Sequence, residues 1–294
     1  MSSGNPGLEE FGFVLEPGSF PCQTLEIHIT HNVYRLSMNV LGHPLVTTKV
    51  CGRMNPDLVL GSYLPDIVPF VPNSVFEFKE IHEGGLEFLH YLEENAPDRI
   101  DVALGMLCHS AKYGADKYSR MLEERFEDYR DCLGERIAEA SNISLEVAKK
   151  ARFHNYLWWG FDVQILRHRE DFCGRLVYHI SNIQEVEPAY QLAQYFDKDI
   201  SLAWRDVDYI LKPMTADRFW SVQGLAELWR DIASGLPEKD DVDVKKTVKI
   251  FEDCADLVED CWEDVLGDVV EGVRTSFEEA DVSLKRPEGC YWYV

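Results

Sequence analysis

Four histidines occupy separate segments of the chain that have helical periodicity: His31, His82, His109 and His154. Acidic residues accompany three of these segments, with Asp66 before His82, Asp116 after His109 and Asp162 after His154. Helical proteins build interior metal sites from such side chains, which project inward from facing helices. Imidazole nitrogen and carboxylate oxygen together suit Zn²⁺. The histidines therefore predict a buried metal site.

Other kinds of chemistry have little support in the sequence. There is no phosphate-binding glycine loop and no GxSxG, CxxC or HExxH motif. The eight cysteines show no short paired spacing, and the residues MSSGNPGLEEFGF do not resemble a signal peptide, so we expect reduced thiols and a cytoplasmic protein. Cys108, next to His109, is interpreted as a small buried side chain. A metal-free enzyme that uses Cys108 or Tyr113, in the cavity where the metal site is predicted, stays an alternative.

The spacing of two acids limits the metal hypothesis. Asp116 follows His109 by seven residues and Asp162 follows His154 by eight. On one straight helix these intervals correspond to about 10–12 Å, too far for one ion to bind both side chains. A bend near Gly114 or Gly160, or separate ions, would relax this limit. Otherwise these acids would be partners of the ligands or plain surface charges.

Composition excludes several classes of partner. The chain has 294 residues, of which 46% are hydrophobic and 12% aromatic, as expected for a folded protein. Its 29 basic and 52 acidic residues give a net charge of −23, which repels nucleic acids and anionic lipid surfaces. No apolar run approaches the roughly 18 residues of a membrane span. A small soluble substrate is the partner that these observations favour, and the oligomeric state stays open.

Periodicity predicts an all-α fold, a multi-helix bundle in three parts. Residues 1–22 form a tail rich in glycine and proline, residues 23–235 form the helical core domain with the metal site, and residues 236–294 form an acidic helical extension packed on it. The predicted helices cover about 30–41, 79–95, 100–113, 144–168, 183–196, 199–211, 216–234 and 243–282. Residues 51–78 are predicted as a short helix with long loops, 234–243 as a linker, and 286–294 as an aromatic end docked on the core; β alternation allows at most a short strand near 174–180.

Five segments resemble, in order, those of the zinc-dependent phospholipase C/P1-nuclease-like family. They are ITHNVYRLSMNVLG with His31, NPDLVLGSYLPDI with Asp66, IHEGGLEFLHYL with His82, ALGMLCHSAKYGAD with His109 and RFHNYLWWGFD with His154. The resemblance spans about residues 27–165. It implies an all-α phospholipase C-like fold around a cluster of metal ions, with these residues as ligands.

Two positions depart from the family pattern. The family has an acid four residues after the histidine that corresponds to His109, and another four residues after the one that corresponds to His154. This chain has Tyr113 and Trp158 at these positions. Residues at i and i+4 share a helix face, so these losses remove negative charge beside two ligands. The resemblance then implies one or two zinc ions rather than a full cluster, with a degenerate, metal-free relative as the alternative. The expected metal ligands are His31, Asp66, His82, His109, Asp116 and His154, with Asp66 and Asp116 as the candidate catalytic acids.

Two functions follow from these expectations. The first is a metal-dependent hydrolase of phosphate esters, in which Asp66 or Asp116 acts as base or as bridging ligand. The second is a catalytically degenerate member of the same fold that serves as a binding or scaffold protein. Metal content would distinguish the two.

Overall fold

Helices make up the regular structure of the residues that the computed structural model describes, 40–236 and 238–285, and no strand occurs among them. This confirms the all-α prediction at the level of the fold class, and the finer, phospholipase C-like assignment stays a prediction. The short strand that the sequence allowed near 174–180 does not form. Phe172, Cys173 and Leu176 are buried at helical spacing, and they belong to a helix instead. His31, the predicted helix 30–41, the predicted tail and the predicted docking of 286–294 lie outside the described residues.

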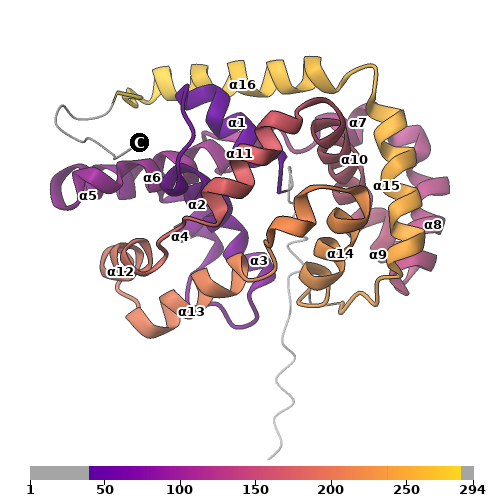
Figure 1. Cartoon of the computed structure of the whole chain (residues 1–294), viewed down its shortest axis with the longest axis horizontal. Coiled ribbons are helices and arrows are strands. Elements are labelled where there is room, and N and C mark those ends of the chain that lie inside the picture. Colours follow the sequence, from indigo (N-terminus) through magenta and orange to yellow (C-terminus); the bar gives the residue numbers. More distant parts are fainter. Residues whose placement is uncertain (1–39, 237, 286–294) are drawn as a thin grey trace, which may run out of the picture. The chain divides into compact units, whose positions relative to one another are not determined.

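The first half of the described chain contains short helices. They are α1 (Gly42–Cys51), α2 (Pro56–Tyr63), η1 (Leu64–Asp66), α3 (Ile67–Phe70), α4 (Phe78–Glu83), α5 (Gly85–Asn95), η2 (Pro97–Arg99), α6 (Ile100–His109), η3 (Ala115–Tyr118), α7 (Met121–Arg125), η4 (Glu127–Tyr129) and α8 (Arg130–Ser141) (Figure 1). Residues 51–78, predicted as mostly loop, are therefore largely helical.

The second half includes the three longest described helices, α10, α15 and α16, together with shorter ones. In chain order, its elements are α9 (Leu145–Val147), the π-helical turn η5 (Ala148–Arg152), α10 (Phe153–His168), α11 (Glu170–Ile180), α12 (Val186–Tyr195), α13 (Ile200–Leu211), η6 (Ala216–Phe219), α14 (Val222–Ala233), α15 (Val244–Val258) and α16 (Trp262–Glu279). The single helix predicted over 144–168 is thus interrupted by a π-helical turn before α10.

Helix α10 is the central element of the described helical core. Every residue from 153 to 165 is buried, as its aromatic content predicts. Helix α15 packs along it, with the rings of Trp159 and Phe251 stacked at 5.2 Å. At Gly160 the backbones come so close that a Cβ would lie 2.6 Å from the carbonyl carbon of Cys254. Residues beyond 235 therefore contribute to the same core as α10.

The segment predicted as a linker is held in place where the structure describes it. The Arg152 guanidinium donates to both carboxylate oxygens of Asp240, from Nε at 2.8 Å and from Nη2 at 3.0 Å. The Asp241 amide also donates to the Ser141 carbonyl oxygen at 2.9 Å. A bidentate, buried guanidinium–carboxylate pair is a strong hydrogen-bonded contact, so this connection between α14 and α15 is fixed to the core.

Helices α2 and α6 cross at two glycines. A Cβ on Gly61 would lie 2.1 Å from the Val102 carbonyl oxygen, and one on Gly105 would lie 2.5 Å from the Leu58 carbonyl oxygen. The absence of side chains lets the two backbones touch. This crossing brings the end of α2 and the end of α6 together, and both ends carry residues of the candidate site.

Candidate metal centre

Three imidazoles converge on one buried carboxylate, that of Asp116. The Nε2 atom of His43 lies 3.6 Å from Oδ1, while Nδ1 of His82 and Nε2 of His109 lie 3.4 Å and 3.5 Å from Oδ2. A second carboxylate, that of Asp66, lies 3.7 Å from the same nitrogen of His109. None of these five side chains is more than 9% exposed. They form the cluster that we call the His/Asp centre.

Each member of the His/Asp centre comes from a different short element. His43 lies in the first turn of α1, Asp66 ends η1, His82 lies on α4, His109 ends α6 and Asp116 lies in η3. The rings of His43 and His109 stack at 3.5 Å with an angle of 7° between their planes. Phe78 stacks on His82 at 4.0 Å. These ring contacts fix the orientation of the imidazoles.

A turn at Gly114 resolves the spacing between His109 and Asp116. Helix α6 ends at His109, and the Gly114 amide donates to the Ser110 carbonyl oxygen at 2.9 Å. A Cβ on Gly114 would lie 2.4 Å from the Leu107 carbonyl oxygen, so only glycine lets the chain fold back this closely. Asp116 returns to His109 through this turn rather than along the helix.

The crossing of α2 and α6 orients His109. The Ser62 carbonyl oxygen accepts a hydrogen bond from Nδ1 of His109 at 2.7 Å. Because Nδ1 then carries the proton, Nε2 is the nitrogen that faces Asp66 and Asp116. A hydrogen bond from the second ring nitrogen to a backbone carbonyl is the usual arrangement of a metal-binding histidine.

Asp162 positions the start of α1. Its carboxylate accepts hydrogen bonds from the amides of Leu41 at 3.1 Å and Gly42 at 2.9 Å. These are among the amides that a helix leaves without a partner at its N-terminus. The next residue is His43. Asp162, which follows His154 on α10, therefore supports the His/Asp centre through the helix that carries His43.

Asp162→Asn is expected to loosen the start of α1. An asparagine offers one acceptor oxygen where two amides need acceptors, so one buried N–H loses its partner at a cost of about 1–3 kcal/mol. We expect a lower free energy of unfolding in urea and weaker metal binding through His43. Asp171→Asn, an exposed acid on α11, is the control for the change in charge. Equal stability of the two variants would contradict this role.

The pKa values of the centre reflect burial and mutual charge. Burial raises the pKa of Asp66 to about 7. Burial lowers the pKa of His82. For His109 burial acts in the same direction, but the carboxylates of Asp116 and Asp66 outweigh it and raise its pKa to about 9. Burial opposes ionisation of Asp116 too, yet His109 and the other imidazoles hold its pKa well below the usual range.

The donor set fits a divalent cation of the zinc type. The nitrogen–oxygen distances of 3.4–3.7 Å exceed the usual hydrogen-bond range of about 2.7–3.2 Å. Tetrahedral Zn²⁺ with ligands at about 2.0–2.1 Å separates neighbouring donor atoms by about 3.3–3.4 Å. One donor atom from each of His43, His109 and Asp116 lies within 4.8 Å of the others, and this group can hold a metal ion. Asp66 and His82 lie directly beside it.

Sequence reasoning and structure agree on part of this set. Of the predicted ligands, Asp66, His82, His109 and Asp116 meet in the His/Asp centre. His154 is buried on α10, but the group of three donors does not include it, so it is left out of the proposed ligands. His43 was not among the ligands predicted from the sequence. The signals that could have found it are Pro44, which is typical of a helix start, and the apolar residues Leu45 and Val46 that follow.

Trp158 and Cys108, which were also singled out from the sequence, are buried side chains with structural contacts. Trp158, at one of the departures from the family pattern, is buried and donates its Nε1 hydrogen to the Ser119 carbonyl oxygen at 3.0 Å. The Cys108 sulfur lies 3.9 Å from that of Cys51. Burial raises the pKa of the Cys108 thiol well above its usual value. A protonated thiol is a poor nucleophile, which argues against the metal-free alternative that relies on Cys108.

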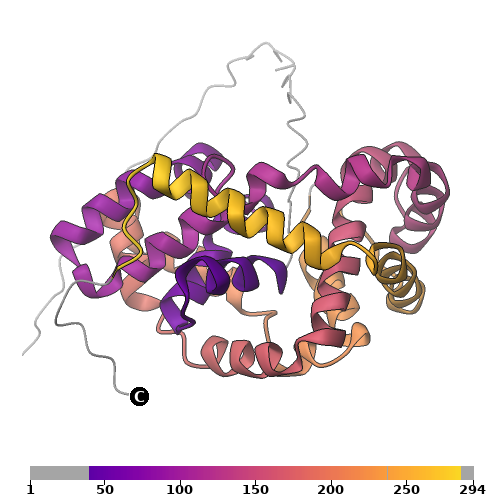
Figure 2. The same cartoon turned by 90° about the horizontal axis from the view of Figure 1, so that it is seen from above.

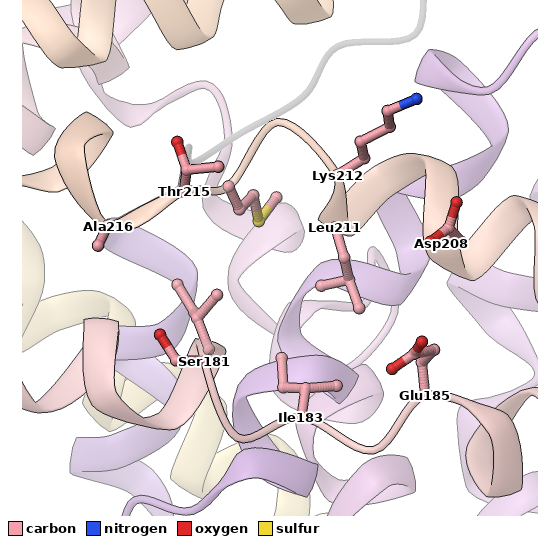
Figure 3. Close-up of a pocket in the computed structure, with 10 residues that line it drawn as sticks. Ser181, Ile183, Glu185, Asp208, Leu211, Lys212, Thr215 and Ala216 are labelled. Carbon is pink, nitrogen blue, oxygen red and sulfur yellow. The ribbon is translucent and has the colours of Figure 1, made fainter.

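A pocket of about 380 Å³ lies elsewhere, between the α11–α12 connection and the end of α13. Figure 3 shows Ile183 and Leu211 pointing into it, and Lys212 pointing away. Glu185 and Asp208 also line it, and its lining includes no member of the His/Asp centre. Its lining includes the hydroxyls of Ser181 and Thr215 but no histidine or cysteine, so the candidate metal chemistry stays with the centre.

Comparisons with models of protein families, with curated proteins and with solved structures found no match to this chain. Among the residues that the structure describes, no helix is both long enough and apolar enough to cross a membrane.

Proposed function

We propose that this protein is a metal-dependent hydrolase of phosphate esters. The convergence of His43, His82 and His109 on Asp116, with Asp66 beside them, is the observation that supports it. We propose His43, His109 and Asp116 as the primary ligands of Zn²⁺. With these three protein ligands, a bound zinc ion would keep a position for water or substrate, as catalytic zinc sites do.

The surroundings of the two carboxylates favour different roles. A bound zinc ion supplies a Lewis acid and lowers the pKa of a water molecule that it coordinates. Asp116 faces three imidazoles, so we assign it as a metal ligand. Asp66 lies within 4 Å of the imidazole of His109 alone among the three histidines of the centre, and its side chain is the most exposed of the five. We assign Asp66 as the proton acceptor.

The order of the segments supports the same proposal. Asp66, His82 and His109 lie in segments that resemble those of the zinc-dependent phospholipase C/P1-nuclease-like family, and His43 directly follows the segment that resembles the opening helix. With a net charge of −23, the protein is repelled by anionic bilayers. A small soluble phosphate ester is therefore the proposed substrate.

A metal-stabilised scaffold is the second candidate function. The side chains of the His/Asp centre are at most 9% exposed, and such burial is found in closed structural metal sites as well as in catalytic ones. Tyr113 and Trp158, in place of two acids of the family pattern, favour the same alternative. In this case the metal would contribute to folding and not to turnover.

Metal content and hydrolysis separate these functions. The protein purified with zinc present is analysed by elemental mass spectrometry and assayed with bis(p-nitrophenyl) phosphate before and after chelation. We expect about one zinc ion or more per chain and activity that chelation removes. Metal without hydrolysis, combined with a lower melting temperature after chelation, would favour the scaffold. Less than about 0.2 ions per chain would exclude the hydrolase and the metal-stabilised form of the scaffold, and would favour a metal-free binding protein.

A pair of histidine variants tests the ligand assignment. His43 and His154 are both 1% exposed and both lie on helices. His43→Gln is expected to weaken zinc affinity by about a hundred-fold or more, since it removes a ligand. His154→Gln is expected to keep the affinity within a few-fold. Loss of zinc only in His154→Gln, measured by competition with a chromogenic chelator, would show that the ligand set is wrong.

A further inference from the structure

The turn that carries Asp116 is held from outside by α16. The residues after Asp116 in η3 are Lys117 and Tyr118. The Lys117 ammonium donates to the Ser276 hydroxyl at 3.2 Å. The Tyr118 ring lies directly over Gly272 of the same helix. The two residues that follow Asp116 in the chain are therefore anchored to α16, while Asp116 itself contacts the histidines.

Helix α16 also contacts the helix that carries His43. Arg274 donates from Nη2 to the Lys49 carbonyl oxygen of α1 at 2.7 Å. Figure 2 shows α16, in yellow, crossing beside α1, in indigo, and the two helices pack against each other. One helix thus contacts two of the elements that supply the three primary ligands.

Gly272 is the position that makes the Tyr118 contact possible. A Cβ there would lie 2.1 Å from the Tyr118 hydroxyl oxygen and 2.3 Å from Cζ. Glycine inside a helix costs about 1 kcal/mol relative to alanine, so the helix gives up stability at this point and gains room for the ring. Gly267, one and a half turns earlier in α16, has no atom within 4 Å of a Cβ. The close approach is therefore particular to Gly272.

We propose that α16 is a positioning element of the metal centre, with Gly272 and Tyr118 as the positioning residues that hold Asp116 against the histidines. Its effect on metal affinity rests on the proposed metal-binding function, whereas its effect on the order of η3 does not. Outer contacts of this kind change metal affinity because they fix where a ligand atom can lie.

The test compares two alanine variants of the full chain, Gly272→Ala and Gly267→Ala. Both add one methyl group to the same helix, but only Gly272→Ala displaces Tyr118. The first readout is hydrogen exchange of the amides of residues 114–119 in the metal-free protein. The second is the affinity for Co²⁺, followed by its visible absorption. We expect faster exchange and about 10–100-fold weaker Co²⁺ binding in Gly272→Ala alone.

A cycle with Tyr118→Ala shows whether the effect passes through the ring. In the Tyr118→Ala background, the additional change Gly272→Ala is expected to alter neither exchange nor affinity. Ser276→Ala, which removes only the acceptor of the Lys117 hydrogen bond, is a milder variant in case Gly272→Ala fails to fold. It is expected to weaken Co²⁺ binding a few-fold.

The outcomes separate the two proposals. Equal exchange and equal Co²⁺ affinity in Gly272→Ala and Gly267→Ala would overturn the positioning role while the metal site stands. A wild-type protein that binds no Co²⁺ would overturn the metal site and the claimed effect on affinity, and the exchange measurement would still decide whether α16 orders η3.

Discussion

Asp116→Asn is expected to abolish metal binding with little change in the fold. Among the residues that the structure describes, Asp116 is the carboxylate that contacts His43, His82 and His109 together. Asparagine has nearly the same shape but no negative charge, and the imidazole ligands are neutral when they bind a metal. We expect zinc affinity to fall by at least about a hundred-fold and any phosphodiesterase activity to fall with it. Competition with a chromogenic chelator measures the first effect.

The control for this variant is Asp131→Asn. It makes the same change in charge at a side chain that is 84% exposed, on α8. Zinc affinity should stay unchanged there, because solvent screens a surface charge at a distance. If Asp116→Asn bound zinc as tightly as Asp131→Asn, Asp116 would not be a ligand. The role of Asp66 would then have to be reconsidered as well.

Gly61→Ala is expected to have the largest effect on stability. Its new methyl group would meet the Val102 carbonyl oxygen at 2.1 Å, and the opposing atom is backbone that cannot rotate away. Helices α2 and α6 must then separate. Overpacking of a close-packed interior costs about 1–3 kcal/mol and sometimes more, and we expect the upper part of this range in urea unfolding.

The same variant should also affect the His/Asp centre. Separation of the two helices moves the Ser62 carbonyl oxygen away from His109, whose ring orientation depends on that hydrogen bond. Gly174→Ala is the matched control, since its Cβ would meet only the Trp220 ring, at 3.5 Å. An unchanged urea midpoint in Gly61→Ala would mean that the α2–α6 crossing tolerates more space than the backbone contact implies.

Local sequence patterns were sufficient for the fold class and for part of the candidate site. Helical periodicity depends on neighbouring residues along the chain, so it predicts helices such as α5, α13 and α14 before any packing is known. Asp66 and His109 could be selected because ionisable side chains in apolar segments need partners when they are buried, and His82 was selected by its place in a helical segment and by the family resemblance. The same local reasoning failed for residues 174–180, whose short apolar run fits a strand or a helix equally well.

The sequence by itself determined that helices would bury several histidines and acids, and the tertiary structure alone decided which of them meet. Asp116 reaches His109 because Gly114 lets the chain fold against the carbonyl of Leu107. His43 joins the centre because Asp162, from a distant helix, accepts the amides at the start of α1. Such contacts join residues far apart in the chain, and their distances depend on how helices pack. No local pattern of residue types encodes that packing, so the ligand set emerges only in the folded protein.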